Sequence, residues 1–518
     1  MKNTKLFMFA ACTLFLAACG KQTVKIMTPP DASNRVLFSA EQLQSTLDKA
    51  GYQVMMQQGD TTFSDPEIKT ILLTEVNDTT LKKEGFHITT TGNLTRVSGR
   101  DGSGVIYGSR ELIDRVNDSD GKLDFPEELK DGPEMVLRGA CVGLQKMTYL
   151  PGHGVYEYPE TPESFPLFYD KEQWIKYLFM LVANRMNSLY LWNCHPFASL
   201  VKLEDYPFAL EVDEETFKKN EEMFSFLTEE ADKRGIFVIQ MFYNIILSKP
   251  FAEHYGLKTQ DRNRPITPLI ADYTRKSIAA FIEKYPNVGL LVCLGEAMCT
   301  VEDDVEWFTK TIIPGVKDGL QALGRTDEPP LLLRAHDTDC KLVMDAALPI
   351  YKNLYTMHKY NGESLTTYEP RGPWSKIHTD LSSLGSIHIS NVHILANLEP
   401  FRWGSPDFVQ KAVQAMHNVH GANALHLYPQ SSYWDWPYTA DKLPNGEREF
   451  QLDRDWIWYQ TWGRYAWNSH RDRADEIGYW NHQLGQFYGT SDENAGNIRI
   501  AYEESGEIAP KLLRRFGI

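Results

Sequence analysis

The middle of the chain repeats one pattern eight times, and this repetition is the strongest constraint on the fold. Short apolar runs that predict strands occupy residues 135–144, 188–195, 236–244, 288–296, 331–337, 354–359, 392–399 and 424–430. Between them lie amphipathic stretches that predict helices, among them 171–186, 214–234, 274–285, 301–323 and 407–420. Eight β/α units in succession are typical of a (β/α)8 TIM barrel rather than an open, doubly wound sheet.

The segments on either side of the repeat differ from it. Before it, helices are expected at 40–50 and 105–116, a strand at 70–76, and a hairpin of 85–90 with 94–99, which predicts a small α/β domain. After Asp453 the sequence is helical and rich in Trp, Tyr and Arg. We therefore expect an N-terminal domain at 20–132, a barrel at 133–440 and a helical region at 441–518. The last amphipathic piece, 511–516, lacks a strong helix stop, so the sequence is compatible with an incomplete last domain.

The first nineteen residues are expected to be a targeting segment and not part of the fold. Lys2 and Lys5 precede a short apolar run, which is followed by Leu16-Ala17-Ala18-Cys19. A positive start, a short apolar core and small residues before a cleavage site are typical of a secretory signal. The Leu-Ala-Ala-Cys sequence is similar to a bacterial lipobox, which implies lipidation of Cys19. We expect an exported lipoprotein anchored to a bacterial membrane, on the periplasmic side or at the cell surface.

Charge and cysteine content exclude several classes of protein. The formal net charge is −16, and an acidic chain repels phosphate backbones, so nucleic acid is not an expected partner. The cysteines are scattered without CxxC pairs. Three of them, Cys141, Cys194 and Cys293, lie within apolar runs and are expected to be buried thiols.

Polar and aromatic side chains gather where the predicted strands end. In a barrel of this type the loops after the strands build the active site. Carboxylates, hydrogen-bonding groups and aromatic rings are the side chains that a saccharide requires. The candidate substrate-binding residues are Trp192, Asn193, His195, Tyr243, Asn244, His336, Asp337, His358, Lys359, Glu363, Arg402, Trp403, Tyr428, Trp434 and Trp436.

Two carboxylates stand out as candidate catalytic groups. Glu296 ends an apolar run that is expected to be buried, and Glu399 follows Ile394-Leu395-Ala396 in the same way. A carboxylate in such a place costs free energy unless it is paired or used in chemistry. The histidines and the Trp residues at 434 and 436 could equally be core side chains. Because the histidines have neither HxH nor HExxH spacing, we expect no metal and no cofactor.

At these residues the chain resembles the bacterial α-glucuronidase family of glycoside hydrolases. Residues 463–468, Gly-Arg-Tyr-Ala-Trp-Asn, are similar to a Gly-Arg-x-Ala-Trp-Asn segment of that family. The stretch from Lys359-Tyr360-Asn361-Gly362 to Glu369-Pro370 is similar to a second family segment, which follows strand six. The resemblance implies a small N-terminal α/β domain, a catalytic barrel and a helical C-terminal domain. It also implies that Glu296 is the general acid and that Glu399 is a general base.

The chain also departs from that family at the site. The family's second basic carboxylate, an Asp after strand six, has no clear match, although Glu363 lies in the same stretch. Tyr368 stands where the family has an Arg, which implies altered chemistry at the bound sugar. We therefore expect an exported glycoside hydrolase that cleaves a complex glycan by an inverting mechanism. Glu296 would protonate the leaving oxygen, while Glu399, aided by Glu363, would activate water.

Other functions stay open at this stage. Carboxylates after strands four and seven also suit retaining barrel hydrolases, in which the second carboxylate is the nucleophile. A non-catalytic glycan-binding lipoprotein could use the same aromatic cleft. A metal-dependent barrel hydrolase is the third alternative. Arg402, Lys359 and Arg371 are candidate partners for the carboxylate of a uronic acid.

Overall fold

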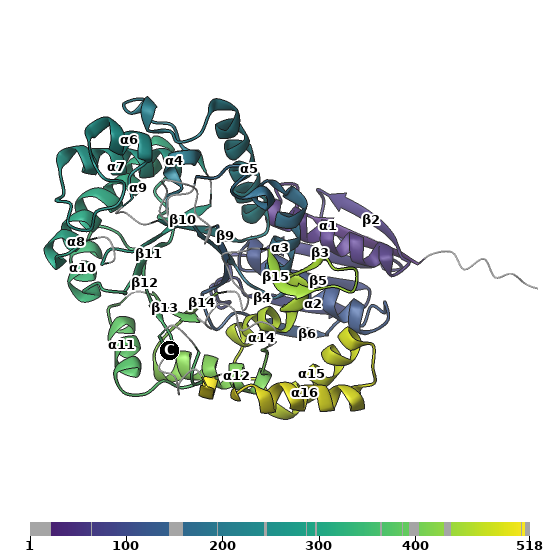
Figure 1. The fold of residues 1–518 in the computed structure, drawn as a ribbon. Helices are drawn as coiled ribbons and strands as arrows, with labels where there is room; N and C mark the ends of the chain where they lie inside the picture. The colour runs from purple at the N-terminus through teal and green to yellow at the C-terminus, as the bar shows by residue number, and fades with distance from the viewer. Residues whose placement is uncertain are drawn as a thin grey trace, which may run out of the picture.

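A computed structural model describes most of the chain in three units (Figure 1). The described residues are 22–63, 65–144, 159–193, 195–242, 246–285, 287–295, 298–362, 365–385, 387–392, 403–428, 437–508 and 510–512. Within these ranges no helix is both long enough and apolar enough to cross a membrane.

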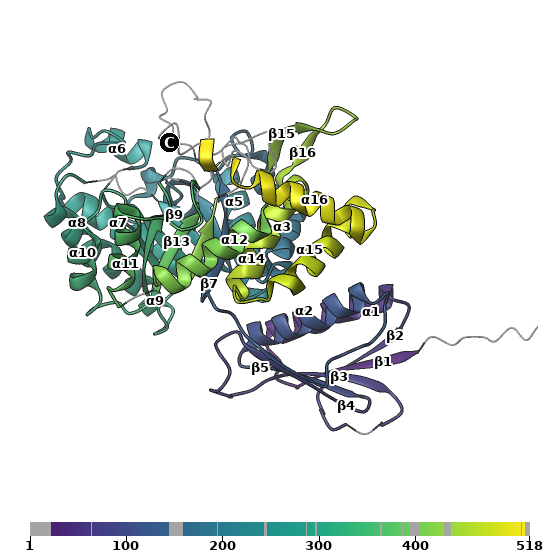
Figure 2. The same ribbon diagram turned by 90° about the horizontal axis from the view of Figure 1, so that it is seen from below.

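The N-terminal unit is a six-stranded mixed sheet with two helices on one face. The strand order is β2-β1-β3-β5-β4-β6. The elements are β1 (Thr23–Thr28), α1 (Asn34–Lys49), β2 (Gln53–Gln58), β3 (Lys69–Glu75), β4 (Phe86–Thr91), β5 (Leu94–Gly99), α2 (Gly102–Asp118) and β6 (Glu128–Asp131). The predicted hairpin is present as the antiparallel pair β4 and β5. Helices α1 and α2 lie between the sheet and the rest of the molecule (Figure 2).

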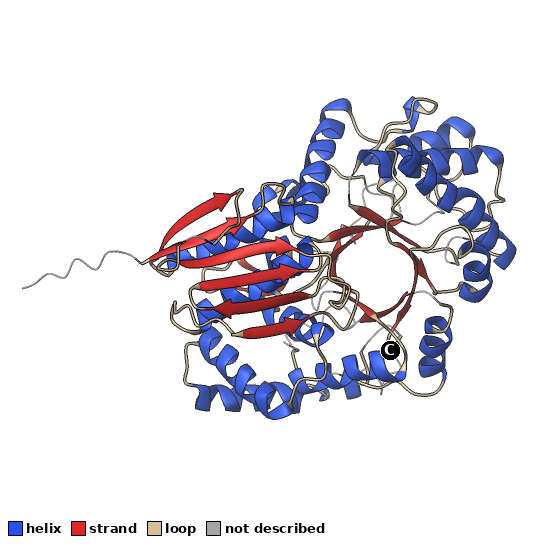
Figure 3. Ribbon diagram, turned by 180° about the vertical axis from the view of Figure 1, so that it is seen from behind, coloured by secondary structure: helices blue, strands red, loops and turns tan. Residues whose placement is uncertain are grey.

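The second unit is a closed barrel of eight parallel strands, ordered β10-β11-β12-β13-β14-β7-β8-β9 around the ring (Figure 3). The strands are β7 (Leu137–Gly143), β8 (Ser188–Trp192), β9 (Phe237–Phe242), β10 (Val288–Val292), β11 (Leu331–Arg334), β12 (Leu354–Lys359), β13 (Ile387–Val392) and β14 (Ala424–Leu427). The α-helices are α3 (Lys171–Ala183), α4 (Phe197–Leu200), α5 (Glu214–Lys233), α6 (Lys249–Tyr255), α7 (Pro268–Lys284), α8 (Val301–Trp307), α9 (Ile313–Ala322), α10 (Cys340–Ala347), α11 (Pro373–Ser382) and α12 (Pro406–Gln414). The predicted (β/α)8 fold is confirmed.

The strands form because both of their faces are buried. All five residues of β10 are buried. Side chains that point outward join the main core beneath the helices, whereas inward-pointing ones, such as Leu291, Tyr190 and Met357, fill the barrel interior. Continuous apolar runs rather than alternating ones are the expected signature of such doubly buried strands.

The position of one predicted barrel strand is wrong. The seventh strand was expected at 392–399, but β13 spans Ile387–Val392. Its sequence contains His388, Ser390 and Asn391, whose polarity hides the strand pattern, yet all three are buried. Two of them make hydrogen bonds there: His388 pairs with Thr356 at 2.9 Å, and Asn391 donates to the carbonyl of His426 at 3.3 Å. For His388 and for the amide nitrogen of Asn391, these hydrogen bonds offset the cost of burying a polar group, whereas Ser390 Oγ and Asn391 Oδ1 have no partner among the described residues.

The third unit is a hairpin followed by helices; the Trp-rich sequence predicts the helices, whereas the hairpin was not expected. Its elements are β15 (Tyr438–Lys442), β16 (Arg448–Phe450), α13 (Gln451–Arg454), α14 (Trp456–Trp467), α15 (Arg473–Tyr488) and α16 (Asp492–Ser505). Helix α14 packs against α12 and β7 of the barrel. Its last residue, Trp467, donates from Nε1 to Asp131 Oδ2 of the N-terminal domain at 2.8 Å. All three units therefore meet at one end of α14.

Candidate active site

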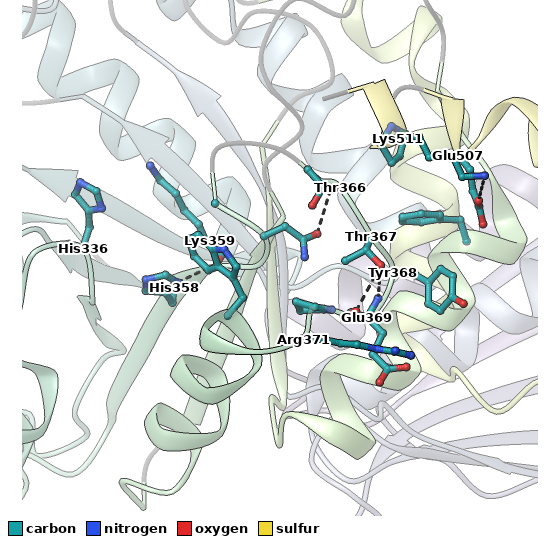
Figure 4. A pocket seen from close by; sticks show the side chains of 16 residues that line it. His336, His358, Lys359, Thr366, Thr367, Tyr368, Glu369, Arg371, Glu507 and Lys511 are labelled. Carbon is teal, nitrogen blue, oxygen red and sulfur yellow. Dashed lines mark hydrogen bonds and ion pairs between the residues drawn. The ribbon is translucent and has the colours of Figure 1, made fainter. Parts of the chain in front are cut away.

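A cavity of about 850 Å³ opens at the C-terminal ends of β11 and β12. Its walls come from these strand ends, from the loop that follows β12, from α11 and α12, and from the last turn of the described chain (Figure 4). It is lined by His336, His358, Lys359, Asn361, Gly362, Thr366, Thr367, Tyr368, Glu369, Pro370, Arg371, Trp374, Phe408, Glu507, Pro510 and Lys511. The cavity therefore lies at the end of the barrel where this fold places its active sites.

Three predicted site residues line this cavity together: His336, His358 and Lys359. His336 follows β11 and is partly exposed, with Nε2 at 3.8 Å from Asp337 Oδ2. Arg371, a candidate partner for a uronic acid, is also in the lining. Cationic groups, two imidazoles and the indole of Trp374 thus face one space.

The tautomer of His358 follows from its hydrogen bond. Its Nδ1 lies 2.9 Å from the carbonyl oxygen of Lys359, and a carbonyl only accepts, so Nδ1 carries the proton. Burial lowers the pKa of His358 and favours the neutral ring. Its Nε2 is therefore a lone-pair acceptor, suited to a sugar hydroxyl.

A chain of buried histidines supports the loop after β12. His378 Nε2 lies 3.2 Å from the carbonyl of Tyr360 and therefore donates to it. His378 Nδ1 must then accept from His388 Nε2 at 2.8 Å, which leaves His388 Nδ1 to accept from the Thr356 hydroxyl. Burial lowers the pKa of His378 to about 3, which keeps this chain neutral. The chain ties β13, α11 and β12 to Tyr360, the first residue after β12.

The barrel interior below the cavity holds Trp192 and Tyr428, whose rings meet edge to face at 5.4 Å. The guanidinium of Arg334, the last residue of β11, lies 5.3 Å from the Trp192 ring and 3.7 Å from Cys293 Sγ. Arg334 is not among the site residues expected from the sequence. The signal was present, because a charged residue that ends a wholly apolar strand meets the same criterion that selected Glu296.

The side chains of Asn193 and His195 contact other residues of the protein interior. The Asn193 amide donates to the carboxyl of Glu160, and its Oδ1 accepts from the His195 backbone N–H at 3.1 Å. The His195 ring lies 3.5 Å from the Tyr273 hydroxyl of α7, and burial lowers its pKa to about 3. These two residues shape the turn after β8, and they do not line the cavity.

Glu160 is a buried carboxyl group that was not expected from the sequence either. It is 1% exposed, and its second oxygen pairs with the Ser199 hydroxyl. Burial raises its pKa to about 8, although the bond from Ser199 acts in the opposite direction. No local pattern marks it, because Asn193 and Ser199, its partners, lie more than thirty residues away in the sequence.

Trp403 occupies a packing position, which corrects its interpretation as a sugar-binding residue. Its side chain is 1% exposed, its Nε1 donates to the carbonyl of Gly506 at 2.8 Å, and its ring meets Trp458 at 5.5 Å. Asp337 lies in the strand-end turn with φ 53°. Its carbonyl would lie 1.8 Å from a Cβ on Gly295, so only glycine fits before Glu296.

The remaining predicted site residues lie outside the described residues. These are Cys19, Tyr243, Asn244, Glu296, Glu363, Glu399, Arg402, Trp434 and Trp436. Cys194 is also outside, whereas Cys141, Cys293 and Cys340 are buried thiols and Cys299 is exposed. Across the part of the chain that the structure describes, no group of three or more His, Cys, Asp or Glu residues is arranged to hold a metal ion.

Solved structures provide the informative comparison, since no model of a known protein family and no curated protein matches the chain. A GH138 enzyme targeting pectin rhamnogalacturonan II is similar, with a TM-score of 0.90 and 73% sequence identity. That match covers 95% of this chain but 56% of the other, so the chain spans little more than half of that enzyme.

More distant structures share the fold. The N-acetyl-β-hexosaminidase of Streptomyces plicatus matches with a TM-score of 0.54 at 12% identity, covering 90% of this chain and 91% of that one. The chitobiase of Flavobacterium johnsoniae matches with a TM-score of 0.55 at 12% identity, covering 93% and 70%. Over nearly its whole length, the chain therefore has the fold and most of the sequence of one part of a glycoside hydrolase of family 138.

Proposed function

We propose that this chain is a glycoside hydrolase that cleaves a bond in a complex, acidic plant polysaccharide, rhamnogalacturonan II or a glycan like it. The observation that carries the proposal is the 73% identity, over 95% of the chain, to an enzyme that targets that pectin. The cavity at the strand ends supports it, because it provides hydrogen-bonding groups and an indole at the end of the barrel where this fold carries its chemistry. The reaction requires two carboxyl groups.

Glu296 is the proposed general acid. It directly follows Gly295, whose N–H donates to Thr338 Oγ1 at 3.0 Å and whose carbonyl accepts from Arg262 at 2.5 Å. Gly295 is thus held from two sides, by the loop that follows β11 and by the connection between α6 and α7. A rigid support of this kind is what a catalytic group needs.

The second carboxylate is either Glu399 or Glu363. Glu399 lies outside the described residues, seven positions after Val392, the last residue of β13. Glu363 directly follows Gly362, which lines the cavity. This favours Glu363 as the partner of Glu296. An inverting reaction, which the α-glucuronidase resemblance implies, needs a separation of about 6.5–9.5 Å between the two carboxyl groups, against about 5 Å for retention.

The sugar at the cleaved bond is proposed to be a uronic acid in an α-linkage, as the α-glucuronidase resemblance implies. Lys359 and Arg371 line the cavity, and Arg334 lies at the top of the barrel interior. Guanidinium and ammonium groups bind a carboxylate through charge-assisted hydrogen bonds. The signal-like N-terminus adds the proposal that the enzyme is exported and anchored to a membrane through Cys19.

The test is turnover of purified rhamnogalacturonan II, measured as released sugar. Glu296→Gln and Glu363→Gln should each lose at least about 1000-fold in kcat, since each removes a group used only in the transition state. Glu399→Gln should lose far less, and Glu447→Gln, in the exposed loop between β15 and β16, should lose nothing. A carboxyl-reduced substrate should be cleaved about 100-fold more slowly.

Several results would overturn this assignment. Near-normal turnover by Glu296→Gln would refute Glu296 as the general acid. If Glu399→Gln were inactive while Glu363→Gln stayed active, the general base would be Glu399 and not Glu363. Binding of the polysaccharide without any release of sugar would identify a non-catalytic glycan-binding protein. Proton NMR of the first sugar anomer released decides between inversion and retention.

A further inference from the structure

The loop after β12 is held at its start through one residue, Tyr360. Its backbone N–H donates to the carbonyl of Asn391 in β13 at 2.8 Å, and its own carbonyl accepts from His378 Nε2 of α11 at 3.2 Å. Its hydroxyl donates at 2.7 Å to the carbonyl of Tyr368, eight residues further along the chain. Lys359, directly before Tyr360, and Tyr368 both line the candidate active site (Figure 4). The contacts that hold Tyr360 therefore also place part of the cavity wall.

The contact between His378 and Tyr360 dictates where the protons lie in the histidine chain, which consists of His378, His388 and Thr356. Because the Tyr360 carbonyl only accepts, His378 Nε2 is the donor, and His378 Nδ1 accepts from His388 Nε2 at 2.8 Å. His388 Nδ1 in turn accepts from the Thr356 hydroxyl at 2.9 Å. A proton added to His378 Nδ1 would face the N–H of His388 with no acceptor between them. The histidine chain is therefore intact only while both rings are neutral.

The groups that face the histidine chain are mostly other imidazoles. His358 of β12 and His420, which follows α12, lie 5.7 Å and 5.6 Å from His378 between ring centroids. Burial, and then these two neighbours, lower the pKa of His378 to about 3. Burial also lowers the pKa of His388 well below its ordinary value of 6.5. A proton on either ring would therefore lie in a buried place that disfavours positive charge.

The charged groups around these imidazoles do not compensate such a proton. Three of them lower the pKa of His358 by their charge: His336, Lys359 and Arg334. Glu369 raises the pKa of His420, but burial outweighs its effect. Lys376 and Asp380, on α11 itself, are exposed and pair with each other at 2.6 Å. Because an uncompensated buried charge is costly, protonation requires the histidine chain to open.

We propose that His378 and His388 are positioning residues of the candidate active site, which hold the start of the loop after β12 in place only while both rings are neutral. Opening brings the two rings into water, where each regains its ordinary pKa of 6.5. Because the pKa of each ring is lowered in the closed state, that state is fully favoured above pH 6.5 and loses ground as the pH falls. For each ring, the open population should rise about 10-fold per pH unit below 6.5. The effect on turnover rests on the proposed function, whereas the opening itself does not.

The experiment measures hydrogen exchange of the full chain by mass spectrometry, in peptides that cover residues 356–368, at pH 7 and pH 5. With rates corrected for the intrinsic effect of pH, the parent should open at least about 20-fold more often at pH 5. The matched variant is His378→Gln/His388→Gln, because each carboxamide keeps one donor and one acceptor and does not titrate. Its opening should change less than about 3-fold between the two pH values. His254→Gln, at an exposed histidine on α6, is the control and should behave like the parent.

A second measurement needs no variant and decides the proposal even if the double variant does not fold. In the parent with ¹⁵N-labelled histidine, His378 should have a protonated Nε2 and an unprotonated Nδ1 at pH 7 and at pH 5. A charged His378 ring in the folded protein at pH 5 would overturn the proposal. Equal pH dependence of opening in the parent and the double variant would do the same.

Turnover tests whether the opening matters for the reaction. The double variant should keep a larger share of its pH 7 kcat at pH 5 than the parent does, by at least about 3-fold. An equal fall in kcat in the two proteins would overturn the positioning role. If the chain releases no sugar at any pH, the exchange result still tests the histidine chain, so failure of the proposed hydrolase and failure of this inference are distinguishable.

Discussion

The buried carboxyl group of Glu160 holds the turn that follows β8. Glu160 accepts from the Asn193 amide and pairs with Ser199, so it fixes the turn that follows β8. An ionised carboxylate would be poorly solvated in this buried place, so burial raises the pKa of Glu160 to about 8. In the folded protein Glu160 is therefore neutral at pH 7, and a carboxamide could replace it.

The stability of the fold should depend on pH through Glu160. The folded pKa is about 8 and the ordinary value is 4.5, so between these values the unfolded chain releases a proton that the folded chain keeps. The contribution of Glu160 to the free energy of unfolding is fully present below pH 4.5. It falls by about 1.4 kcal/mol per pH unit as the pH rises from 4.5 to 8. Glu160→Gln should abolish this contribution to the slope. Urea unfolding at pH 5, 6, 7 and 8 measures it.

The matched control for this measurement is Glu504→Gln, because Glu504 is exposed on α16. Its stability should follow the parent at every pH. If Glu160→Gln also follows the parent across the whole range, the carboxyl is ionised in the folded protein and the assignment is wrong.

At the scale of elements, α14 holds the three units together. Trp467 at its end meets Tyr107 at 4.9 Å and lies over the guanidinium of Arg185, in addition to its hydrogen bond to Asp131. Trp467 thus packs largely against the N-terminal domain, whereas Arg464 pairs with Glu476 within the helical region.

Truncation of Trp467 should therefore destabilise the whole molecule. Trp467→Ala removes a fully buried indole and should cost about 3–5 kcal/mol of unfolding free energy, read from thermal or urea unfolding. Phe487→Ala, which truncates a half-exposed ring on α15, should cost far less. Equal losses in the two variants would show that Trp467 does not join the units.

At the scale of the whole molecule, the proposed membrane anchor lies outside the described residues and rests on the sequence alone. If Cys19 carries lipid, the mature protein should partition with membranes, because acyl chains insert into the bilayer. Cys19→Ala should move the protein into the soluble fraction, as measured by fractionation and immunoblotting. Cys299→Ala, at an exposed cysteine of the folded part, is the control and should leave partitioning unchanged. A Cys19→Ala protein that still sediments with membranes after a high-salt wash would refute the anchor.

The order of elements could be predicted from the sequence because it depends on local periodicity. Apolar runs such as 288–292 and the amphipathic stretch of α5 carry the β and α patterns within a few residues, so the eight β/α units were visible. The resemblance to a glycoside hydrolase family drew on short local motifs in the same way. Where a strand satisfied its polar side chains with distant partners, as His388 does in β13, the local pattern failed.

What only the tertiary structure decided is which side chains meet. Asn193 looked free to bind sugar, but Glu160, far away in the sequence, occupies its amide. Trp403 looked like a stacking surface, but Gly506 and Trp458 enclose it. The sequence by itself determined the (β/α)8 architecture, because the apolar pattern of each β/α unit is carried by residues that are close together in the sequence. It did not determine the pairing of Trp467 with Asp131, 336 residues apart, because such a contact forms only when the chain has folded.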